Sequence, residues 1–555
     1  MSSSSAVPPS ARPPLAPADV ATIKAGYAFD APALELGALV NGEALPEVPI
    51  RIPLAMINRH GLVAGATGTG KTKTLQLLTE QLSNAGVPVF AADIKGDLSG
   101  LASPGTSSPA LLERASSVGE RWTPASSPTE YFSLGGLGTG IPIRASVRGF
   151  GPLLLSKVLG LNPTQESSLG LVFHYADGAG LPLVDLDDLR AVLMHLISDQ
   201  GKQELAELGG LSKATTNVIL RELVGFTDQG ADVFFGEPAI DVRTFLRMAP
   251  DGVRGLVSLL EVPSVQDKPE LFSTFLMWLL SELYEALPEV GDADKPKLVF
   301  FFDEAHLLFA NASKDFLQIV TQTVRLIRSK GVGIFFVTQT PKDVPGDVLA
   351  QLGSRVQHQL RAHTPDDARA LKATVSTYPI SGYDLAQVLQ NLATGEAIVT
   401  VMNEKGAPSP VAWTRLRVPQ SSMSPTPQEQ RDAAVAASPL LAQFGTRVQH
   451  TSARDILEQR AAAAAADLAA ADAQQLLASQ ARAAMAQADD AASALARQQR
   501  DAEASVAKAA KQEQADADRA DRERLKAVDR MGRQTSRRGG LVRRIVGKIF
   551  GSTRG

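Results

Sequence analysis

Short, continuously apolar runs alternate along this chain with stretches of helical periodicity. The runs at 297–302, Lys-Leu-Val-Phe-Phe-Phe, and at 333–338 are typical of parallel strands that are buried on both faces. The residues between them, 314–329, predict a helix. This strand–helix–strand rhythm favours an α/β fold with a mainly parallel sheet. Shorter strands are expected at 62–64, 87–92, 356–360 and 397–401.

Changes in composition divide the first three quarters of the chain. We expect a disordered Ser/Pro/Ala-rich arm over 1–24, followed by the first part of the α/β core over 25–103. Residues 104–295 mix glycine-rich connections with helical periodicity, which is clearest at 186–197 and 271–287. They predict a large, mostly helical insertion. The second part of the core is expected over 296–418.

Beyond residue 418 the sequence loses the features of an α/β core. Residues 419–453 begin with a Ser/Pro-rich stretch and predict a linker, whereas 454–530 are rich in alanine, which favours helix. The few large apolar residues in this alanine-rich segment keep no steady heptad register. Two interpretations stay open, a long exposed helix that could form a weak coiled coil, or a disordered segment.

The last segment, 531–555, is basic and amphipathic. From Arg530 to the end there are eight basic residues and no acidic one, interleaved with Leu, Val, Ile and Phe at helical spacing. Such a helix is typical of binding to an anionic membrane surface or a protein partner. A basic tail could equally bind the phosphate backbone of DNA, or be a frayed, solvated end.

Overall charge and composition exclude some classes of function. The 55 basic and 59 acidic residues give a net charge of −4, so whole-chain charge makes no case for nucleic acid. The absence of cysteine excludes disulfides, thiolate metal sites and cysteine nucleophiles. No apolar run reaches the roughly 20 residues that a spanning helix needs. We therefore expect a soluble protein of the cytoplasm, with the basic tail able to hold it at the inner face of the membrane.

One glycine-rich stretch carries specific chemistry. Residues 65–72 match G-x-x-x-x-G-K-[ST] and lie between an apolar run and a helical stretch, which is the context of a P-loop. Its backbone N–H groups and the following helix N-terminus would hold the phosphates of ATP. Lys71 would reach the β- and γ-phosphates, and the Thr72 hydroxyl would bind Mg²⁺. The residues of this predicted phosphate-binding loop are Gly65, Ala66, Thr67, Gly68, Thr69, Gly70, Lys71 and Thr72.

Polar residues follow three of the predicted strands. Asp303 and Glu304 end the run 297–302, where Asp303 would hold Mg²⁺ through water and Glu304 would accept a proton from the attacking water. Gln339 ends the next strand and is a candidate sensor of the γ-phosphate. Asp93 and Lys95 end a strand that we expect beside the P-loop, where they either contact the ligand or cap a turn.

An arginine from a neighbouring subunit often assists phosphoryl transfer. Four downstream candidates are Arg325, Arg328, Arg355 and Arg361. A single arginine on a helix is more often a solvated surface residue, so the residues alone do not choose among them.

Several motifs together resemble a known family. The P-loop, the turn 93–97, the sequence 302–306, the stretch 325–333 and Thr338-Gln339 resemble the HerA/FtsK superfamily of P-loop ATPases. The run 353–358 and the following 364–367 resemble, more narrowly, a bacterial HerA-like branch, the YjgR type.

This resemblance covers roughly residues 25–418. It implies a RecA-like ATPase core, hydrolysis assisted by glutamate, and a ring, usually hexameric, with ATP between subunits. It also implies that Arg355 acts in trans.

Two functions compete. The first is an ATP-driven HerA/FtsK-like ring motor that translocates DNA as a helicase or translocase. The second is an ATP-dependent protein remodeller or membrane-surface switch that DNA does not stimulate. The near-neutral charge of the chain keeps the second function open.

Overall fold

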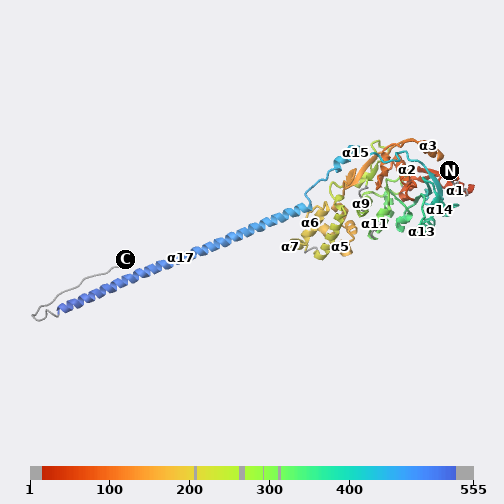
Figure 1. Cartoon of the computed structure of the whole chain (residues 1–555). Helices are drawn as coiled ribbons and strands as arrows, with labels where there is room; N and C mark the ends of the chain where they lie inside the picture. The colour runs from red at the N-terminus through yellow and green to blue at the C-terminus, as the bar shows by residue number, and fades with distance from the viewer. Residues whose placement is uncertain (1–14, 206–208, 262–268, 292, 310–313, 533–555) are drawn as a thin grey trace, which may run out of the picture. The chain divides into compact units, whose positions relative to one another are not determined.

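The computed structural model describes residues 15–205, 209–261, 269–291, 293–309 and 314–532 (Figure 1). The chain divides into two compact units, Met1–Gln459 and Arg460–Gly555. Most of the predicted arm and of the predicted basic tail, residues 1–14 and 533–555, lie outside the described residues.

The first unit is built on one mixed sheet. Within the described residues this sheet has 12 strands in the order β2-β1-β12-β11-β10-β3-β9-β8-β4-β7-β5-β6. The strands are β1 Ala33–Asn41, β2 Glu43–Pro53, β3 Gly61–Ala64, β4 Val89–Asp93, β5 Thr129–Leu134, β6 Ile141–Ile143, β7 Val257–Glu261, β8 Leu298–Phe302, β9 Val332–Thr338, β10 Ser354–Gln357, β11 Glu396–Thr400 and β12 Ala412–Leu416.

Strand direction divides the sheet into two parts. The eight strands from β10 to β6 run parallel. The remaining four, β11, β12, β1 and β2, continue the sheet antiparallel beyond β10. The prediction of an α/β, RecA-like fold with a mainly parallel sheet is confirmed.

Helices connect the parallel strands and cover both faces of the sheet. The α-helices of the described residues are α1 Pro17–Gly26, α2 Lys71–Asn84, α3 Pro109–Ser117, α4 Val147–Val158, α5 Pro163–Gly178, α6 Leu186–Leu196, α7 Asp199–Glu204, α8 Lys213–Asp228, α9 Pro269–Ala286, α10 His306–Phe309, α11 Lys314–Ile327, α12 Gly346–Leu349, α13 Pro365–Val375, α14 Leu385–Asn391, α15 Gln428–Ala437, α16 Pro439–Phe444 and α17 Ala453–Gly532.

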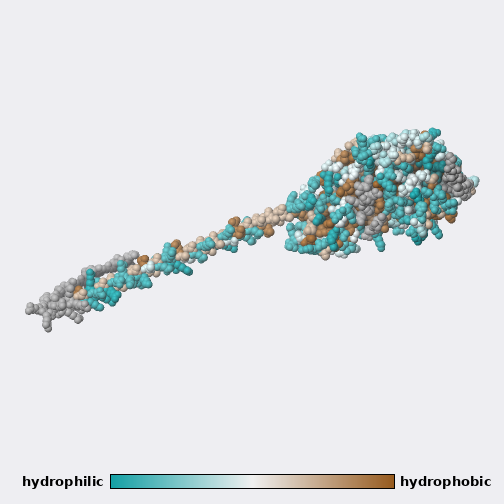
Figure 2. Space-filling model, viewed as in Figure 1, coloured by the Kyte–Doolittle hydropathy of each residue, from teal (hydrophilic) through white to brown (hydrophobic). Residues whose placement is uncertain are grey.

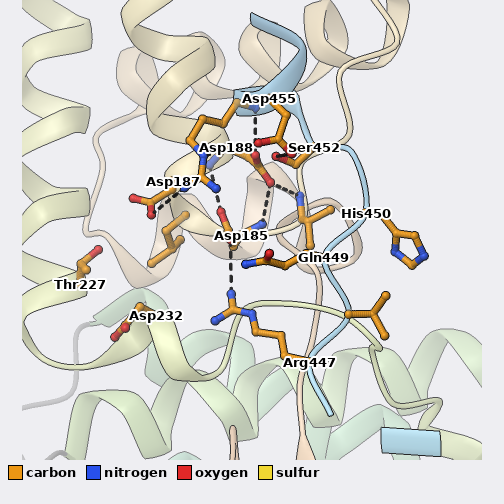
Figure 3. Close-up of a pocket in the computed structure, with 14 residues that line it drawn as sticks. Asp185, Asp187, Asp188, Thr227, Asp232, Arg447, Gln449, His450, Ser452 and Asp455 are labelled. Carbon is orange, nitrogen blue, oxygen red and sulfur yellow. Dashed lines mark hydrogen bonds and ion pairs between the residues drawn. The ribbon is translucent and has the colours of Figure 1, made fainter. Parts of the chain in front are cut away.

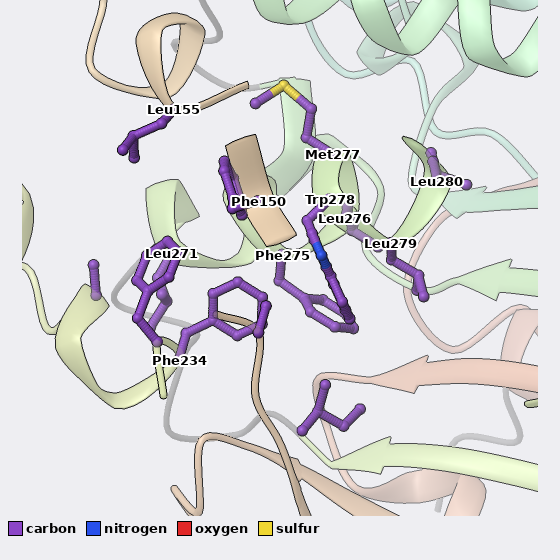
Figure 4. Close-up of a cluster of buried hydrophobic side chains, with 14 of the residues drawn as sticks. Phe150, Leu155, Phe234, Leu271, Phe275, Leu276, Met277, Trp278, Leu279 and Leu280 are labelled. Atoms are coloured by element: carbon purple, nitrogen blue, oxygen red, sulfur yellow. The ribbon is translucent and has the colours of Figure 1, made fainter. Parts of the chain in front are cut away.

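The central strand β8 is buried on both faces, as its sequence predicts. Leu298, Phe300 and Phe302 join the core under α9 and α11, whereas Val299 and Phe301 join the core under α2. Figure 4 shows the aromatic centre of the first of these cores. There the rings of Phe234 and Trp278 meet edge to face at 5.4 Å, a favourable geometry for aromatic pairs.

The predicted insertion, 104–295, does contain helices α3 to α9, but it also contains strands that the sequence analysis did not predict. Its residues include β5, β6 and β7, which complete the parallel side of the same sheet. β7, Val-Ser-Leu-Leu-Glu, is fully buried between β4 and β5. A stretch of five residues in which three are apolar does not distinguish a buried strand from part of a helix, which is why periodicity missed it.

The predicted arm and linker also need correction. Residues 17–24 are helical in α1, which Pro17 begins at a position that favours proline. The segment 419–427 is packed against α2, because the Glu80 carboxylate on that helix accepts hydrogen bonds from the backbone N–H groups of Gln420 and Ser421, each at 2.8 Å. Lys73 also donates to the Met423 carbonyl at 2.7 Å. This part of the predicted linker is therefore a strap over α2.

The C-terminal end of the predicted linker also contacts the rest of the first unit (Figure 3). Residues 447–455 line a cavity of about 330 Å³ beside α6, where Arg447 pairs with Asp185 at 3.3 Å. The backbone N–H of Arg454 donates to the buried Asp188 carboxylate at 3.0 Å. None of the predicted site residues lines this cavity.

The second unit is helical in its described part. All residues from 460 to 528 are exposed, and Figure 2 shows apolar residues scattered along the visible face among polar ones. The interpretation as a long exposed helix is therefore confirmed for α17, and disorder is wrong for these residues. Among the described helices, none combines the length and hydropathy that crossing a membrane requires.

Candidate active site

The glycine-rich loop 65–72 joins the end of β3 to the start of α2. Lys71 is the first residue of α2, and its ammonium group bends back to donate to the carbonyls of Gly65 at 2.7 Å and Ala66 at 3.3 Å. A side chain at Gly65 would place its Cβ 2.4 Å from the Cβ of His358. This close approach explains why the loop begins with glycine.

His358 supports the loop from behind. Its backbone N–H donates to the Ala64 carbonyl at 2.7 Å, and its Nε2 lies 2.9 Å from the Thr74 hydroxyl on α2. Burial, together with the charge of Lys71, lowers the pKa of His358 to about 4, so the ring is neutral. The sequence showed this residue only as part of a family motif, and its supporting role was missed.

Asp303 and Glu304 follow β8 at the same edge of the sheet as the loop. Strand β9 separates β3 from β8, and the register pairs Val63 with Val337. Burial lowers the pKa of Lys71, and the negative charges of Glu304 and Asp303 oppose that shift. The structure therefore brings the loop lysine and both carboxyl groups together, as expected from the sequence.

The two carboxyl groups differ in their electrostatics. Burial and the adjacent Glu304 raise the pKa of Asp303 to about 6. Burial alone would also raise the pKa of Glu304, but contacts with His306 and Lys95 outweigh it and lower that pKa to about 2. Glu304 has a φ of +47°, a left-handed conformation that is unusual for a side chain of this size. Such outliers often occur at functional sites.

Glu304 has two basic neighbours, Lys95 and His306. Its Oε1 forms an ion pair with Lys95, and its Oε2 lies 3.1 Å from His306 Nδ1, at an orientation that falls short of a hydrogen bond. Lys95 follows β4, and β4 lies beside β8. The expectation that this strand lies beside the P-loop strand is wrong, because β9 and β8 intervene.

The turn after β4 places two further carboxylates near the loop. Asp93 accepts hydrogen bonds from the backbone N–H groups of Gly96 at 2.7 Å and Leu98 at 2.8 Å, so it caps the turn. Asp97 accepts a hydrogen bond from the Thr72 hydroxyl at 3.4 Å. Thr72, Asp97 and Asp303 thus offer hydroxyl and carboxylate oxygens at one edge, the donor chemistry that Mg²⁺ prefers. Within the described residues no group of three or more His, Cys, Asp or Glu forms a metal site by itself.

Gln339 lies at the exposed end of β9, one residue after Thr338. The Thr338 carbonyl accepts a hydrogen bond from the Gly65 backbone N–H at 3.2 Å. Gln339 is therefore placed between the loop and the end of β8, where the sequence predicted a sensor.

The four candidate arginines separate into two groups. Arg361 lies on the loop side, where its Nη2 is 3.4 Å from the Thr67 carbonyl. The other three lie at the opposite edge of the sheet, because Arg355 is at the start of β10, where Ser354 pairs with Gly61 at the start of β3. They line a cavity of about 680 Å³ together with Arg59, which sequence reasoning missed.

The cavity lined by Arg59, Arg325, Arg328 and Arg355, which we call the arginine cavity, has an unusual charge. Its lining residues, all of them described, include four arginines and no acidic residue. Arg355 donates to the Thr377 hydroxyl at 2.7 Å and lies 5.9 Å from the centre of the Tyr378 ring. The cavity therefore offers several positive charges to an anion.

The chain is similar to a known protein family and to several known proteins. The family model described as "Helicase HerA-like C-terminal" matches residues 39–554. A probable helicase of Methanocaldococcus jannaschii is 30% identical over 150 residues, which are 26% of this chain and 28% of that relative. A DNA double-strand break repair helicase HerA of Sulfolobus acidocaldarius is 23% identical over 67% of each chain. Among solved structures, the bacterial conjugative coupling protein TrwBdeltaN70 aligns with a TM-score of 0.49 at 16% identity, covering 74% of this chain and 94% of that one.

Proposed function

The chain belongs to the helicase HerA-like C-terminal family of P-loop ATPases, and on that premise we propose that it is an ATP-driven motor that acts on DNA as a homo-hexameric ring. The observation that carries this proposal is the convergence of Lys71, Asp303 and Glu304 at one edge of the parallel sheet. A phosphate-binding cation, a metal-binding carboxylate and a general base are the groups that hydrolysis of a phosphoanhydride requires.

Each residue has a distinct proposed role. The backbone of residues 65–72 and the N-terminus of α2 hold the phosphates, with Lys71 at the terminal ones. Thr72 and Asp303 hold Mg²⁺, which would neutralise phosphate charge. Glu304 accepts the proton of the attacking water, and Gln339 orients that water or contacts the γ-phosphate.

The arginine cavity supports the ring. Arg355 and its neighbours lie across the sheet from the loop of their own chain, so they cannot reach the phosphates that this loop holds. In a head-to-tail ring, the side of the sheet that carries these arginines would face the loop of the next subunit. We therefore propose that Arg355, with Arg325 and Arg328, acts in trans, whereas Arg361 stays with its own loop.

DNA is the proposed substrate because two relatives are named DNA double-strand break repair helicases. The protein would then act in the cytoplasm. The alternative function, a protein remodeller or a switch at the inner membrane surface, is favoured by the net charge of −4. In that case residues 531–555, outside the described residues, would bind an anionic membrane or a protein partner.

The test is ATP hydrolysis by the full chain with no DNA, with single-stranded DNA and with double-stranded DNA, at low and high salt. We expect hydrolysis that DNA stimulates and that loses this stimulation at high salt, because phosphate contacts release counterions. Glu304→Gln should abolish turnover. Glu43→Gln, which removes a carboxylate that is 90% exposed, is the matched control and should not.

The outcomes separate the two functions. Hydrolysis without stimulation by either DNA under any salt condition contradicts the motor on DNA and favours the remodeller or switch. Release from anionic vesicles after deletion of residues 531–555 would then identify the membrane-surface form. A purified chain that hydrolyses no ATP contradicts both.

A further inference from the structure

The ion pair between Lys95 and Glu304 engages the proposed general base directly. Glu304 is almost fully buried, with 6% of its side chain exposed, whereas 41% of the Lys95 side chain is exposed. The carboxylate is therefore fixed in position, and the ammonium group reaches it from the solvent side. This asymmetry makes Lys95 the partner that can leave.

The pair opposes the role that Glu304 has in hydrolysis. A general base needs a free oxygen within hydrogen-bond reach of water and a pKa that is not far below the working pH. One oxygen of Glu304 is bound by Lys95, and the other makes no hydrogen bond but is buried 3.1 Å from His306. A carboxylate held in this way is a poor proton acceptor.

Lys95 also lies close to the phosphate-binding lysine. The positive charges of Lys95 and Lys71 disfavour each other, and both are balanced by Glu304 and Asp303. Phosphate oxygens near Lys71 would therefore compete with Glu304 for the Lys95 ammonium group. Charge-assisted hydrogen bonds to phosphate are among the strongest that a lysine forms.

The turn that carries Lys95 is held in place. The Asp93 carboxylate caps it through the backbone N–H groups of Gly96 and Leu98, and Gly96 takes a left-handed φ of +78°. A change of partner by Lys95 would therefore be made by rotation about its side-chain bonds, on a backbone that these contacts hold.

We propose that Lys95 is a positioning residue that exchanges partners, from the Glu304 carboxylate to the terminal phosphate of a nucleotide held by residues 65–72, and thereby frees Glu304 to accept a proton from water. This inference rests on the proposed function. It links release of the base to the presence of a third phosphate, so that a bound diphosphate leaves Glu304 paired.

The test is a double-mutant cycle measured by nucleotide binding instead of turnover. The affinities of full-length wild type, Lys95→Met, Glu304→Gln and the double variant are measured by calorimetry for ATPγS and for ADP, each with Mg²⁺. Lys95→Arg keeps the charge and should behave like wild type. Lys342→Met removes a half-exposed lysine with only a 3.9 Å ion pair and is the matched control.

Partner exchange gives an asymmetric result. In the Glu304→Gln background, Lys95→Met should weaken ATPγS binding about tenfold, because Lys95 then contacts the phosphate and has no ion pair to break. Where Glu304 is present the loss should be only about twofold, since the ion pair that must be broken offsets the new contact. Affinity for ADP should change less than about twofold in every variant.

Two other outcomes overturn the inference. If Lys95 stays on Glu304 and only screens its charge, Lys95→Met weakens ATPγS binding more when Glu304 is present than when it is Gln. Equal losses in both backgrounds show that the two residues are not coupled. In either case, binding of ADP and ATPγS by the wild type remains consistent with the proposed ATPase. A wild type that binds neither nucleotide contradicts both proposals.

Discussion

The carboxyl ends of the parallel strands form one side of the sheet, here the carboxyl edge, and their amino ends form the other, the amino edge. These two edges carry opposite arrangements of charge. At the carboxyl edge, basic and acidic side chains lie close together. Glu304 forms an ion pair with Lys95 and lies 3.1 Å from His306. At the amino edge, the lining residues of the arginine cavity, all within the described part of the chain, include no acidic partner. The comparison shows that opposite charges are paired within one chain at the first edge, whereas the unmatched positive charge at the second is the basis of our proposal that it acts on a neighbouring subunit.

The largest effect is expected at the carboxyl edge. Glu304→Gln should reduce turnover by about 10³-fold, because general base catalysis contributes on this scale. ATPγS should still bind, since the change leaves Lys71 and the loop intact. Steady-state hydrolysis and calorimetry check the two parts. Loss of binding together with turnover would show that Glu304 is needed for the shape of the site and would weaken its assignment as a base.

The next effect tests the amino edge. Arg355→Ala should lower turnover by about 10²-fold, less than a single arginine supplies in other phosphoryl-transfer enzymes, because neighbouring arginines share the cavity. If the edge acts in trans, mixing this variant with Lys71→Ala should restore part of the turnover, since some interfaces then combine an intact loop with an intact arginine.

The control for this prediction is Arg243→Ala, which removes an exposed arginine paired with Asp241. It should leave turnover unchanged. Mixtures that stay as inactive as their components would contradict action in trans and make the two edges independent.

A smaller effect is expected from the close packing behind the loop. Gly65→Ala forces its Cβ to within 2.4 Å of His358, so it should destabilise the chain by about 2 kcal/mol, as overpacking does. Gly346→Ala, where the added Cβ meets nothing within 4 Å, should be neutral. Thermal unfolding of both variants measures the difference. Equal melting temperatures would show that the loop can move away from His358.

The smallest effect concerns the charge on Asp303. Its pKa is raised from 3.8 to about 6 by burial and by Glu304, so the folded chain binds this proton more tightly than the unfolded chain. The stability from this group is fully present below pH 3.8 and is lost as the pH rises through about 6.

Asp303→Asn removes that charge. In buffer with a metal chelator, it should raise the free energy of unfolding by about 1 kcal/mol at pH 7.5 and by much less at pH 4. Denaturant unfolding at both pH values tests this. An equal effect at both would show that ionisation of Asp303 costs the fold nothing.

Sequence patterns predicted the centre of this structure better than its margins. β8 was predictable because five consecutive apolar residues fit a strand buried on both faces, and the loop 65–72 because its spacing is specific. β7 was missed because its five residues, only three of them apolar, are equally compatible with a helix in a region of helical periodicity.

Contacts that depend on strand order could not be predicted. The pairing of Lys95 with Glu304 requires β4 to lie beside β8, and no local pattern fixes that order. The position of Arg355 could be predicted in part, because Arg355 lies at the start of a strand whereas Asp303 follows one. In parallel strands these two positions lie at opposite edges.

The place of β3 in the sheet also determines how late in synthesis β3 can pair with its neighbouring strands. β3 lies between β9 and β10, and its register pairs Gly61 with both Phe335 and Ser354. The ribosome makes these two partners about 270 and 290 residues after β3 itself. Until then the strand that precedes the loop has two unpaired edges, which are prone to wrong pairing during synthesis. A nascent chain stopped before Ser354 is thus expected to depend on chaperones, and to gain resistance to proteases only once β10 has emerged.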